Sequence, residues 1–171
     1  MKKYILFIFT CVILFGCGKK EETSNALFST SNNMDAANFW MNINTITKGT
    51  AHTGYYASKL DTLFQFGIGL NPKVKDLTDK TPKKVTVKCW VYSTTPNLEA
   101  SIVCDPIING EKLGWKNFDF KPVIKKANEW TEVIATFDLP KNITPDTELG
   151  VYIWNPNKLM FFVDDFEFSI E

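Results

Sequence analysis

The segment Val85-Thr86-Val87-Lys88-Cys89-Trp90-Val91-Tyr92 (residues 85–92) decides the fold class, because valine or cysteine occupies every second position in it. Side chains that alternate with a period of two are typical of a β-strand with one buried face. The alternation recurs at residues 131–139 and 149–154 and, less regularly, at residues 100–104 and 113–120. The chain is therefore predicted to be built from strands, without an amphipathic helix.

Turn signals separate these strands. Asn109-Gly110 lies between two of the runs, and this dipeptide favours a tight hairpin turn. Most prolines also fall between the runs, where a missing N–H does not interrupt a ladder of hydrogen bonds. With further strands expected at residues 55–60 and 63–70, about eight or nine strands belong to one domain. The prediction is an all-β fold, a two-sheet β-sandwich of the jelly-roll type.

The N-terminus has the pattern of an export signal. Met1-Lys2-Lys3 precedes an apolar run at residues 4–15 that is too short to span a membrane in the mature protein. Because Gly16 is followed by Cys17, the segment resembles a bacterial lipoprotein signal with a lipobox. The resemblance implies that Cys17 is acylated, for example with palmitate, and becomes the mature N-terminus. The alternative is an ordinary signal peptide with a chance cysteine.

The predicted organisation has three parts. Residues 1–16 are the lipoprotein signal peptide, residues 17–37 a lipidated, flexible, polar tether, and residues 38–171 the β-sandwich domain. Lys20-Glu21-Glu22 resembles the lysine-then-acidic export signal of surface lipoproteins, and a solvated linker is the alternative. The expected location is the cell envelope, with the protein anchored by lipid to a bacterial membrane: the outer membrane, with surface exposure if that signal acts.

The charge of the chain argues against nucleic-acid binding. There are 19 basic and 19 acidic residues, so the formal net charge is zero. Every basic residue is a lysine, so the planar guanidinium that binds phosphates and guanine in bidentate fashion is missing. Without a positive field or arginine, nucleic acid is not an expected partner.

Two cysteines of the predicted domain, Cys89 and Cys104, lie in alternating segments. An export compartment permits a disulfide between them, yet two core-facing cysteines are as easily small buried apolar side chains. Both alternatives stay open at this point, because a sequence does not define the geometry that a disulfide needs.

The last alternating stretch, residues 159–170, contains an aspartate, Asp164, between phenylalanines. Strict alternation places Asp164 on the same face as Phe166 and Phe168, and so in the core. A carboxylate there must be paired, hydrogen-bonded several times or bound to a metal, because burial of a lone charge is costly. Backbone N–H groups or a calcium ion would each satisfy it.

Four segments, in order, resemble carbohydrate-binding modules of the galactose-binding-like jelly-roll type, particularly the family 4/9 modules. Residues 51–60 (AHTGYYASKL) resemble their early A-H-S-G-x-x-S-L segment, and residues 89–92 (CWVY) resemble their strand with a central tryptophan. Residues 128–133 (NEWTEV) resemble the G-x-W-x-x-V strand, and residues 161–166 (FFVDDF) the terminal F-x-V-D-D-V strand. The resemblance covers about residues 38–171 and implies the same fold and a carbohydrate ligand.

The resemblance also implies a structural Ca²⁺. In that family the aspartate of the terminal strand and backbone carbonyls of the early turn commonly hold it. Carried over, Asp164 is the side-chain ligand, Thr53 and Gly54 form the turn, and Asp35 is a third contributor. The family's N-terminal glutamate after a phenylalanine is not evident here, so a calcium-free variant is the alternative. The only histidine, His52, is interpreted as a packing or hydrogen-bonding residue.

Aromatic side chains carry the functional interpretation, because sugar rings stack their C–H faces on flat aromatic surfaces while polar groups bind the hydroxyls. The predicted ligand-binding residues are Trp90, Tyr92, Trp115, Tyr152 and Trp154. The first two share a strand face, as do the last two, and all four line one concave surface if their strands lie in one sheet. Core packing of these side chains is the alternative.

Two other tryptophans are assigned to packing. Trp130 is expected in the core, and Trp40 near the entry to the domain. Neither is a predicted ligand residue.

No catalytic constellation is recognised, and the protein is predicted not to be an enzyme. One histidine excludes most triads, and the adjacent Asp164 and Asp165 face opposite sides of a strand. The main hypothesis is a lipid-anchored, non-catalytic envelope protein that holds a polysaccharide or oligosaccharide on aromatic side chains. The alternative is an envelope adhesion or assembly lipoprotein whose β-sandwich binds another protein.

Overall fold

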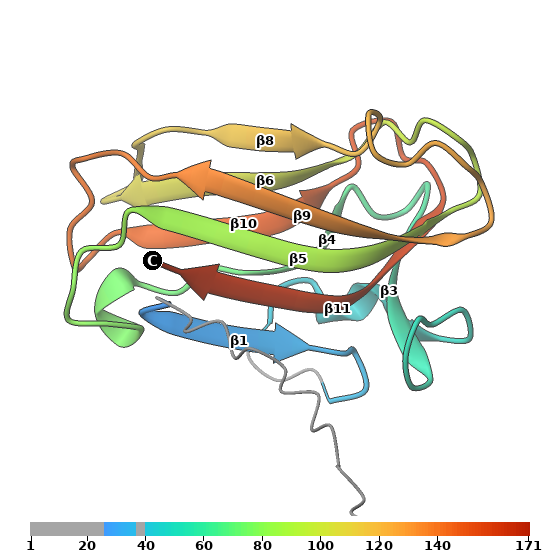
Figure 1. Ribbon diagram of the computed structural model, residues 1–171, viewed down its shortest axis with the longest axis horizontal. Coiled ribbons are helices and arrows are strands. Elements are labelled where there is room, and N and C mark those ends of the chain that lie inside the picture. The colour runs from blue at the N-terminus through green and yellow to red at the C-terminus, as the bar shows by residue number, and fades with distance from the viewer. Residues whose placement is uncertain (1–25, 37–39) are drawn as a thin grey trace, which may run out of the picture.

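The computed structural model describes residues 26–36 and 40–171. Within them the chain forms two antiparallel sheets that lie face to face, as Figure 1 shows, so the predicted all-β sandwich is confirmed. No helix among the described residues is long and apolar enough to cross a membrane. The predicted signal peptide, Cys17 and the Lys20-Glu21-Glu22 signal lie outside the described residues.

The first sheet, called sheet A, has six strands in the described residues, in the order β2-β3-β11-β5-β9, with β1 also paired to β11. Its strands are β1 (Phe28–Asn32), β2 (Ile46–Lys48), β3 (Tyr56–Leu60), β5 (Lys84–Ser93), β9 (Trp130–Asp138) and β11 (Phe161–Ile170). Strand β11 is central, because β5 pairs along one side of it while β3 and then β1 pair along the other.

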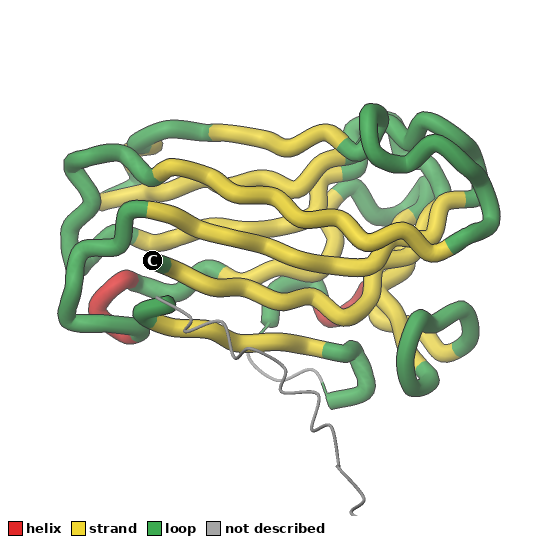
Figure 2. The backbone as a smooth tube through the Cα atoms, in the orientation of Figure 1, coloured by secondary structure: helices red, strands yellow, loops and turns green. Residues whose placement is uncertain are grey.

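The second sheet, called sheet B, has five strands in the described residues, in the order β4-β10-β6-β7, with β8 also paired to β6. Its strands are β4 (Phe66–Leu70), β6 (Ser101–Ile108), β7 (Glu111–Lys112), β8 (Lys116–Asp119) and β10 (Glu148–Trp154). Two single-turn 3₁₀ helices, η1 (Ile43–Thr45) and η2 (Val74–Asp76), interrupt the loops between strands, which Figure 2 shows in green.

The hairpin predicted at Asn109-Gly110 is confirmed. Both residues have positive φ, 50° and 83°, and Ile108 pairs with Glu111 across the turn between β6 and β7. Asparagine and glycine tolerate this left-handed backbone best, which is why the dipeptide is a strong local signal.

Strand β1 corrects the predicted domain boundary. The sandwich was expected to begin at residue 38, after a flexible tether, but Phe28 pairs with Ile170 and Asn32 with Phe166 in sheet A. Leu27 also packs against the core. The folded domain therefore begins before residue 38, because the edge of β11 left free by the short β3 takes up another strand.

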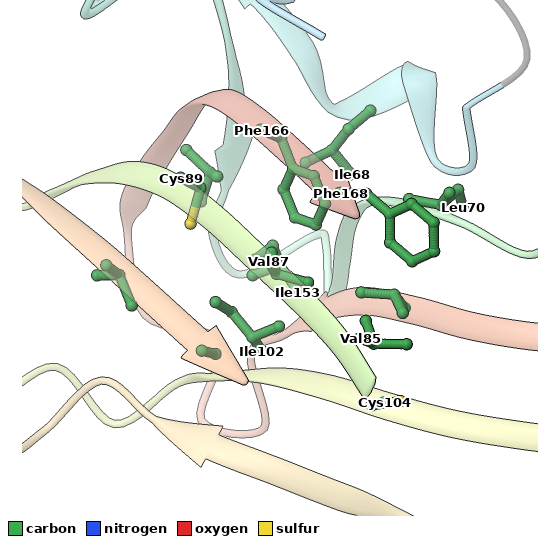
Figure 3. Close-up of a cluster of buried hydrophobic side chains, with 14 of the residues drawn as sticks. Ile68, Leu70, Val85, Val87, Cys89, Ile102, Cys104, Ile153, Phe166 and Phe168 are labelled. Atoms are coloured by element: carbon green, nitrogen blue, oxygen red, sulfur yellow. The ribbon is translucent and has the colours of Figure 1, made fainter. Parts of the chain in front are cut away.

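The core lies between the sheets and matches the alternation in the sequence. Val85, Val87 and Cys89 of β5 are fully buried and face Ile102 and Ile153 of sheet B, as Figure 3 shows. Phe166 and Phe168 of β11 fill the space beside them (Figure 3). These phenylalanines are among the largest fully buried side chains, so they contribute much of the apolar surface removed from water.

The two core cysteines are free thiols. Cys89 and Cys104 are both buried, one on each sheet, and they do not form a disulfide. Burial raises the pKa of the Cys104 thiol to about 12, because a thiolate loses its hydration there. The sequence left open a disulfide or two small buried apolar side chains, and the structure shows the second alternative.

A β-bulge in β11 reverses the predicted orientation of Asp164. The pairing of β11 with β5 shifts between Asp164 and Glu167, and Asp165 has a φ of 46°. The extra residue changes the phase of the alternation, so Val163 and Phe166 both point into the core. Asp164 consequently lies on the outer face of sheet A, and the prediction that it points into the core with the phenylalanines is wrong.

Candidate functional site

The predicted aromatic residues lie on two different sheets. Trp90 and Tyr92 belong to β5 of sheet A, whereas Tyr152 and Trp154 belong to β10 of sheet B. Their neighbours along each strand point into the core, so the two pairs face away from each other on the outer faces of the sandwich. The single surface lined by four aromatic side chains is therefore not formed.

The outer face of sheet B gathers three of the five predicted residues. The Trp115 and Trp154 rings lie 5.7 Å apart between centroids and nearly perpendicular, at 88°. The Tyr152 ring makes a similar contact with Phe66 of β4, at 5.7 Å and 73°. Phe66 is 47% exposed and Trp115 is 40% exposed. We call Phe66, Tyr152, Trp154 and Trp115 the aromatic row.

Phe66 was missed by the sequence interpretation. In residues 63–70 it alternates in step with Ile68 and Leu70, which are buried in the core. The pairing between β10 and β4 shifts between Tyr152 and Trp154, and this irregularity accompanies the exposure of the phenylalanine ring. The alternation of apolar residues within one strand does not indicate a shift in its pairing with a neighbouring strand, so the exposure of Phe66 could not be predicted from it.

Polar side chains border the aromatic row on β6 and β8. Ser101 pairs with Trp154 on one side and with Asp119 on the other. The Ser101 hydroxyl donates to Asp119 Oδ1 at 2.8 Å, and the Asn117 amide donates to the same oxygen at 2.6 Å. A pocket of about 220 Å³ beside Trp154 is lined in part by Ser101 and Asp119. Hydroxyl, amide and carboxylate groups therefore lie next to the partly exposed Trp154 ring.

A second polar pair lies further along β6. Lys112 Nζ of β7 donates to Asp105 Oδ2 at 2.9 Å, and this contact raises the pKa of the lysine. Asp105 is only 4% exposed, and its other oxygen, Oδ1, has no hydrogen-bond partner in the described part of the chain. Alternation could have revealed Asp105, because Ile102 and Cys104 face the core and leave residue 105 on the outer face.

On sheet A, the aromatic side chains pack against one another. The His52 imidazole lies flat on the Trp90 indole, with 3.9 Å between centroids and an angle of 12°. Trp130 contacts both His52 and Tyr92, and it lies partly exposed on this outer face. The expectation that Trp130 is a core residue is therefore wrong. His52 covers one face of Trp90, which leaves less of that ring for a ligand than was predicted.

Trp40 has the packing role that was expected of it. Its ring packs on the edge of Phe166 at 5.5 Å between centroids, and it is partly buried against the core.

Asp164 holds the turn at residues 51–54 through its carboxylate. Oδ2 accepts the backbone N–H groups of His52 at 2.7 Å and Thr53 at 3.1 Å, while Oδ1 accepts the N–H of Asp165 at 2.7 Å. Burial raises the pKa of Asp164, and the three N–H groups act in the opposite direction. Asp165 adds side-chain bonds to His52 Nδ1 and to the Thr53 hydroxyl, each at 2.6 Å.

These contacts do not fit a calcium ion at Asp164. Calcium takes several oxygen ligands, but His52 and Thr53 turn N–H groups toward the carboxylate. The Asp35 carboxylate packs on Gly54 and accepts the N–H of Tyr55. Among the described residues, no three histidine, cysteine, aspartate or glutamate side chains are placed to share a metal. Calcium remains a prediction that these residues, as they lie, do not support.

Comparison with solved structures gives the same fold. The chain is similar to a CBM22 xylan-binding domain, formerly called the x6b domain (TM-score 0.56, 11% identity, covering 86% of this chain and 97% of that one). It is also similar to the CBM22-2 xylan-binding domain of Paenibacillus barcinonensis Xyn10C (TM-score 0.54, 15% identity, covering 85% of this chain and 100% of that one). The tandem CBM22-1-CBM22-2 domain of the same protein matches with a TM-score of 0.57 and 16% identity, over 85% of this chain and half of the tandem.

No family model matches the chain, and no characterised protein matches it in sequence. At these low identities the likeness to solved structures is one of fold. The β-sandwich fold that these xylan-binding domains have is therefore established for this chain, while membership of family 4/9 stays a prediction.

Proposed function

We propose that this protein binds a polysaccharide or oligosaccharide, without catalysis, on the outer face of sheet B. The observation that carries the proposal is the aromatic row, four adjacent rings bordered by Ser101, Asn117 and Asp119. Aromatic faces stack on the C–H faces of sugar rings, and the bordering groups bind hydroxyls. The xylan-binding domains of the same fold support a sugar ligand.

The arrangement of the rings favours a single glycan chain over a flat crystalline surface. Within each contacting pair the ring planes are nearly perpendicular, at 73° and 88°. Coplanar rings would be needed to lie together on a flat array of parallel chains. The rings of the aromatic row are not coplanar, so soluble polysaccharides are the proposed ligands.

A non-catalytic role agrees with where the only histidine lies. The only histidine of the chain, His52, is on the outer face of sheet A, stacked on Trp90 and bonded to Asp165. It is therefore on the opposite face from the aromatic row, where it cannot act as a general base for a bound sugar.

The proposal includes a lipid anchor at Cys17 and a place in the cell envelope. It rests on the signal-like residues 1–16 and the Gly16-Cys17 junction. Bacterial cells that express the protein should incorporate labelled palmitate into it, and Cys17→Ser should abolish the label. A labelled Cys17→Ser protein, or an unlabelled wild type, would contradict the anchor.

One observation favours the alternative of a protein partner. Strand β9 is an edge of sheet A, nine residues long, with Ile134 at 54% exposure on its outer face. Edge strands of this length can pair with a strand of another chain. The substitution Ile134→Lys separates the two proposals, because it should disturb a protein complex and leave sugar binding unchanged.

The test of sugar binding is affinity electrophoresis of the purified protein through a panel of soluble polysaccharides that includes xylan. We expect at least one of them to slow the wild type, and Trp154→Ala and Tyr152→Ala to weaken that binding at least about tenfold. Tyr55→Ala is the matched control, because this tyrosine is 69% exposed but lies outside the aromatic row. Unchanged migration across the whole panel would overturn the proposal.

A further inference from the structure

The buried carboxylate of Asp105 lies at the same face as the aromatic row. On β6, Asp105 pairs with Gly150 and Val103 pairs with Tyr152, so Asp105 is diagonal to Tyr152 on the outer face of sheet B. The two backbones pack closely at this pair, because a Cβ on Gly150 would lie 2.9 Å from the Asp105 backbone oxygen and 3.8 Å from the Asp105 Cβ. The carboxylate is therefore next to a ring of the proposed sugar site.

One oxygen of this carboxylate is left without a partner. Lys112 Nζ donates to Oδ2, and Oδ1 has no hydrogen-bond partner in the described residues although the side chain is only 6% exposed. Buried acceptors are nearly always satisfied, because an unpaired one loses its hydration without compensation. A strong acceptor kept unpaired beside a binding surface indicates that a donor arrives with the ligand.

Lys112 is the described side chain that bonds to this carboxylate, through the other oxygen, Oδ2. Its side chain is 60% exposed and belongs to the two-residue strand β7. Asp105 is the main cause of the raised pKa of Lys112, and the Tyr152 hydroxyl adds a smaller electrostatic contribution in the same direction. An exposed lysine side chain changes rotamer easily, so it can turn into solvent when a sugar reaches Tyr152.

We propose that Asp105 accepts a hydroxyl of the bound sugar through Oδ1 and that Lys112 is the removable cover of this subsite. The inference rests on the proposed sugar-binding function and specifies it further. A carboxylate takes a hydroxyl donor and repels another carboxylate, so the ligand class is a neutral glycan in preference to a uronic acid polymer.

The test uses the full-length protein with soluble xylan as the probe and polygalacturonate as the acidic competitor. Asp105→Asn should weaken binding at least about tenfold, the loss typical of a hydrogen bond to a charged group. Lys112→Met should bind as tightly as the wild type or more tightly, because the cover no longer competes with the sugar. Polygalacturonate should not displace xylan.

Stability separates a binding role from a purely structural ion pair. Lys112→Met leaves the buried carboxylate unpaired and should lower the urea midpoint, whereas Asp105→Asn removes a buried charge and should not lower it. Asp105→Asn should thus lose affinity without losing stability, and Lys112→Met should lose stability without losing affinity. A structural pair would instead give two variants that lose affinity and stability together.

The outcomes also distinguish this inference from the function on which it rests. If the wild type binds no polysaccharide of the panel, the proposed sugar-binding function and the proposed role of Asp105 are both overturned. If the wild type binds, Trp154→Ala does not, and Asp105→Asn binds like the wild type, only the role of Asp105 is overturned. Displacement of xylan by polygalacturonate would overturn the proposed preference for neutral glycans.

Discussion

The substitution Asp164→Ala should release the turn at residues 51–54 from sheet A. In the wild type, this fully buried carboxylate accepts the N–H groups of His52, Thr53 and Asp165. Alanine leaves these three donors without an acceptor. Because His52 also stacks on Trp90, release of the turn should also disturb the packing of the aromatic side chains on the outer face of sheet A.

The expected cost follows from the three lost bonds. A buried donor left unpaired costs about 1–3 kcal/mol, and a turn near the surface can regain water, so the lower end applies and gives about 3 kcal/mol in total. Removing a buried charge returns part of this, since burial raises the pKa of Asp164. The expected loss of unfolding free energy is about 2–3 kcal/mol, or a Tm lower by roughly 4–12 °C.

Two matched variants define the comparison. Asp164→Asn keeps one oxygen that can still accept from His52 and Thr53, so its loss should be smaller than that of alanine. Glu167→Ala changes an exposed carboxylate of the same strand whose described contact is Lys88, and it should cost less than about 0.5 kcal/mol.

Urea unfolding followed by tryptophan fluorescence measures all three free energies, provided that the slope against urea is unchanged. The reasoning is refuted if Asp164→Ala unfolds with the same free energy as Glu167→Ala. It is also refuted if asparagine costs as much as alanine, because the remaining amide oxygen would then play no part.

Three further predictions concern the metal, the thiols and the packing. Because N–H groups surround Asp164, a chelator should leave the Tm unchanged. If a chelator instead lowers the Tm of the wild type but not that of Asp164→Ala, a calcium ion is bound at Asp164. Since burial raises the pKa of Cys104 to about 12, iodoacetamide at pH 8 should label it only after unfolding; rapid labelling of the native protein would contradict its burial. Gly67→Ala puts a Cβ 2.7 Å from Leu60 Cδ1 and should lower the free energy of unfolding by about 1–3 kcal/mol. In the control Gly114→Ala the nearest neighbour lies at 3.4 Å, so the free energy of unfolding should hardly change. Equal stabilities of the two variants would refute this prediction.

The long strands could be predicted because their information is local. In β5 the alternation of valine with polar or aromatic residues reports which side chains are buried, and the structure agrees at each position from Val85 to Val91. The hairpin at Asn109-Gly110 was likewise visible, since its backbone needs residues that tolerate positive φ.

Strand β1 could not be predicted in the same way. Its sequence, Phe28-Ser-Thr-Ser-Asn32, is mostly polar and is similar in composition to the residues before it, which were predicted to be a tether. It becomes a strand because β11 continues beyond its pairing with β3 and offers hydrogen-bonding groups along that edge. A partner more than a hundred residues away in the chain decides its conformation.

By itself, the sequence determined which side chains are available: alternating apolar residues for a two-sheet sandwich, aromatic residues on the other faces of those strands, and a single histidine, which excludes most catalytic triads. Only the tertiary structure decided which of them meet. Pairing put β5 and β10 in different sheets, so Trp90 and Trp154 face opposite sides, and the bulge at Asp165 turned Asp164 out of the core. The reason is that sheet assignment and register depend on hydrogen bonds between distant strands, whereas alternation reports only the strand in which it occurs.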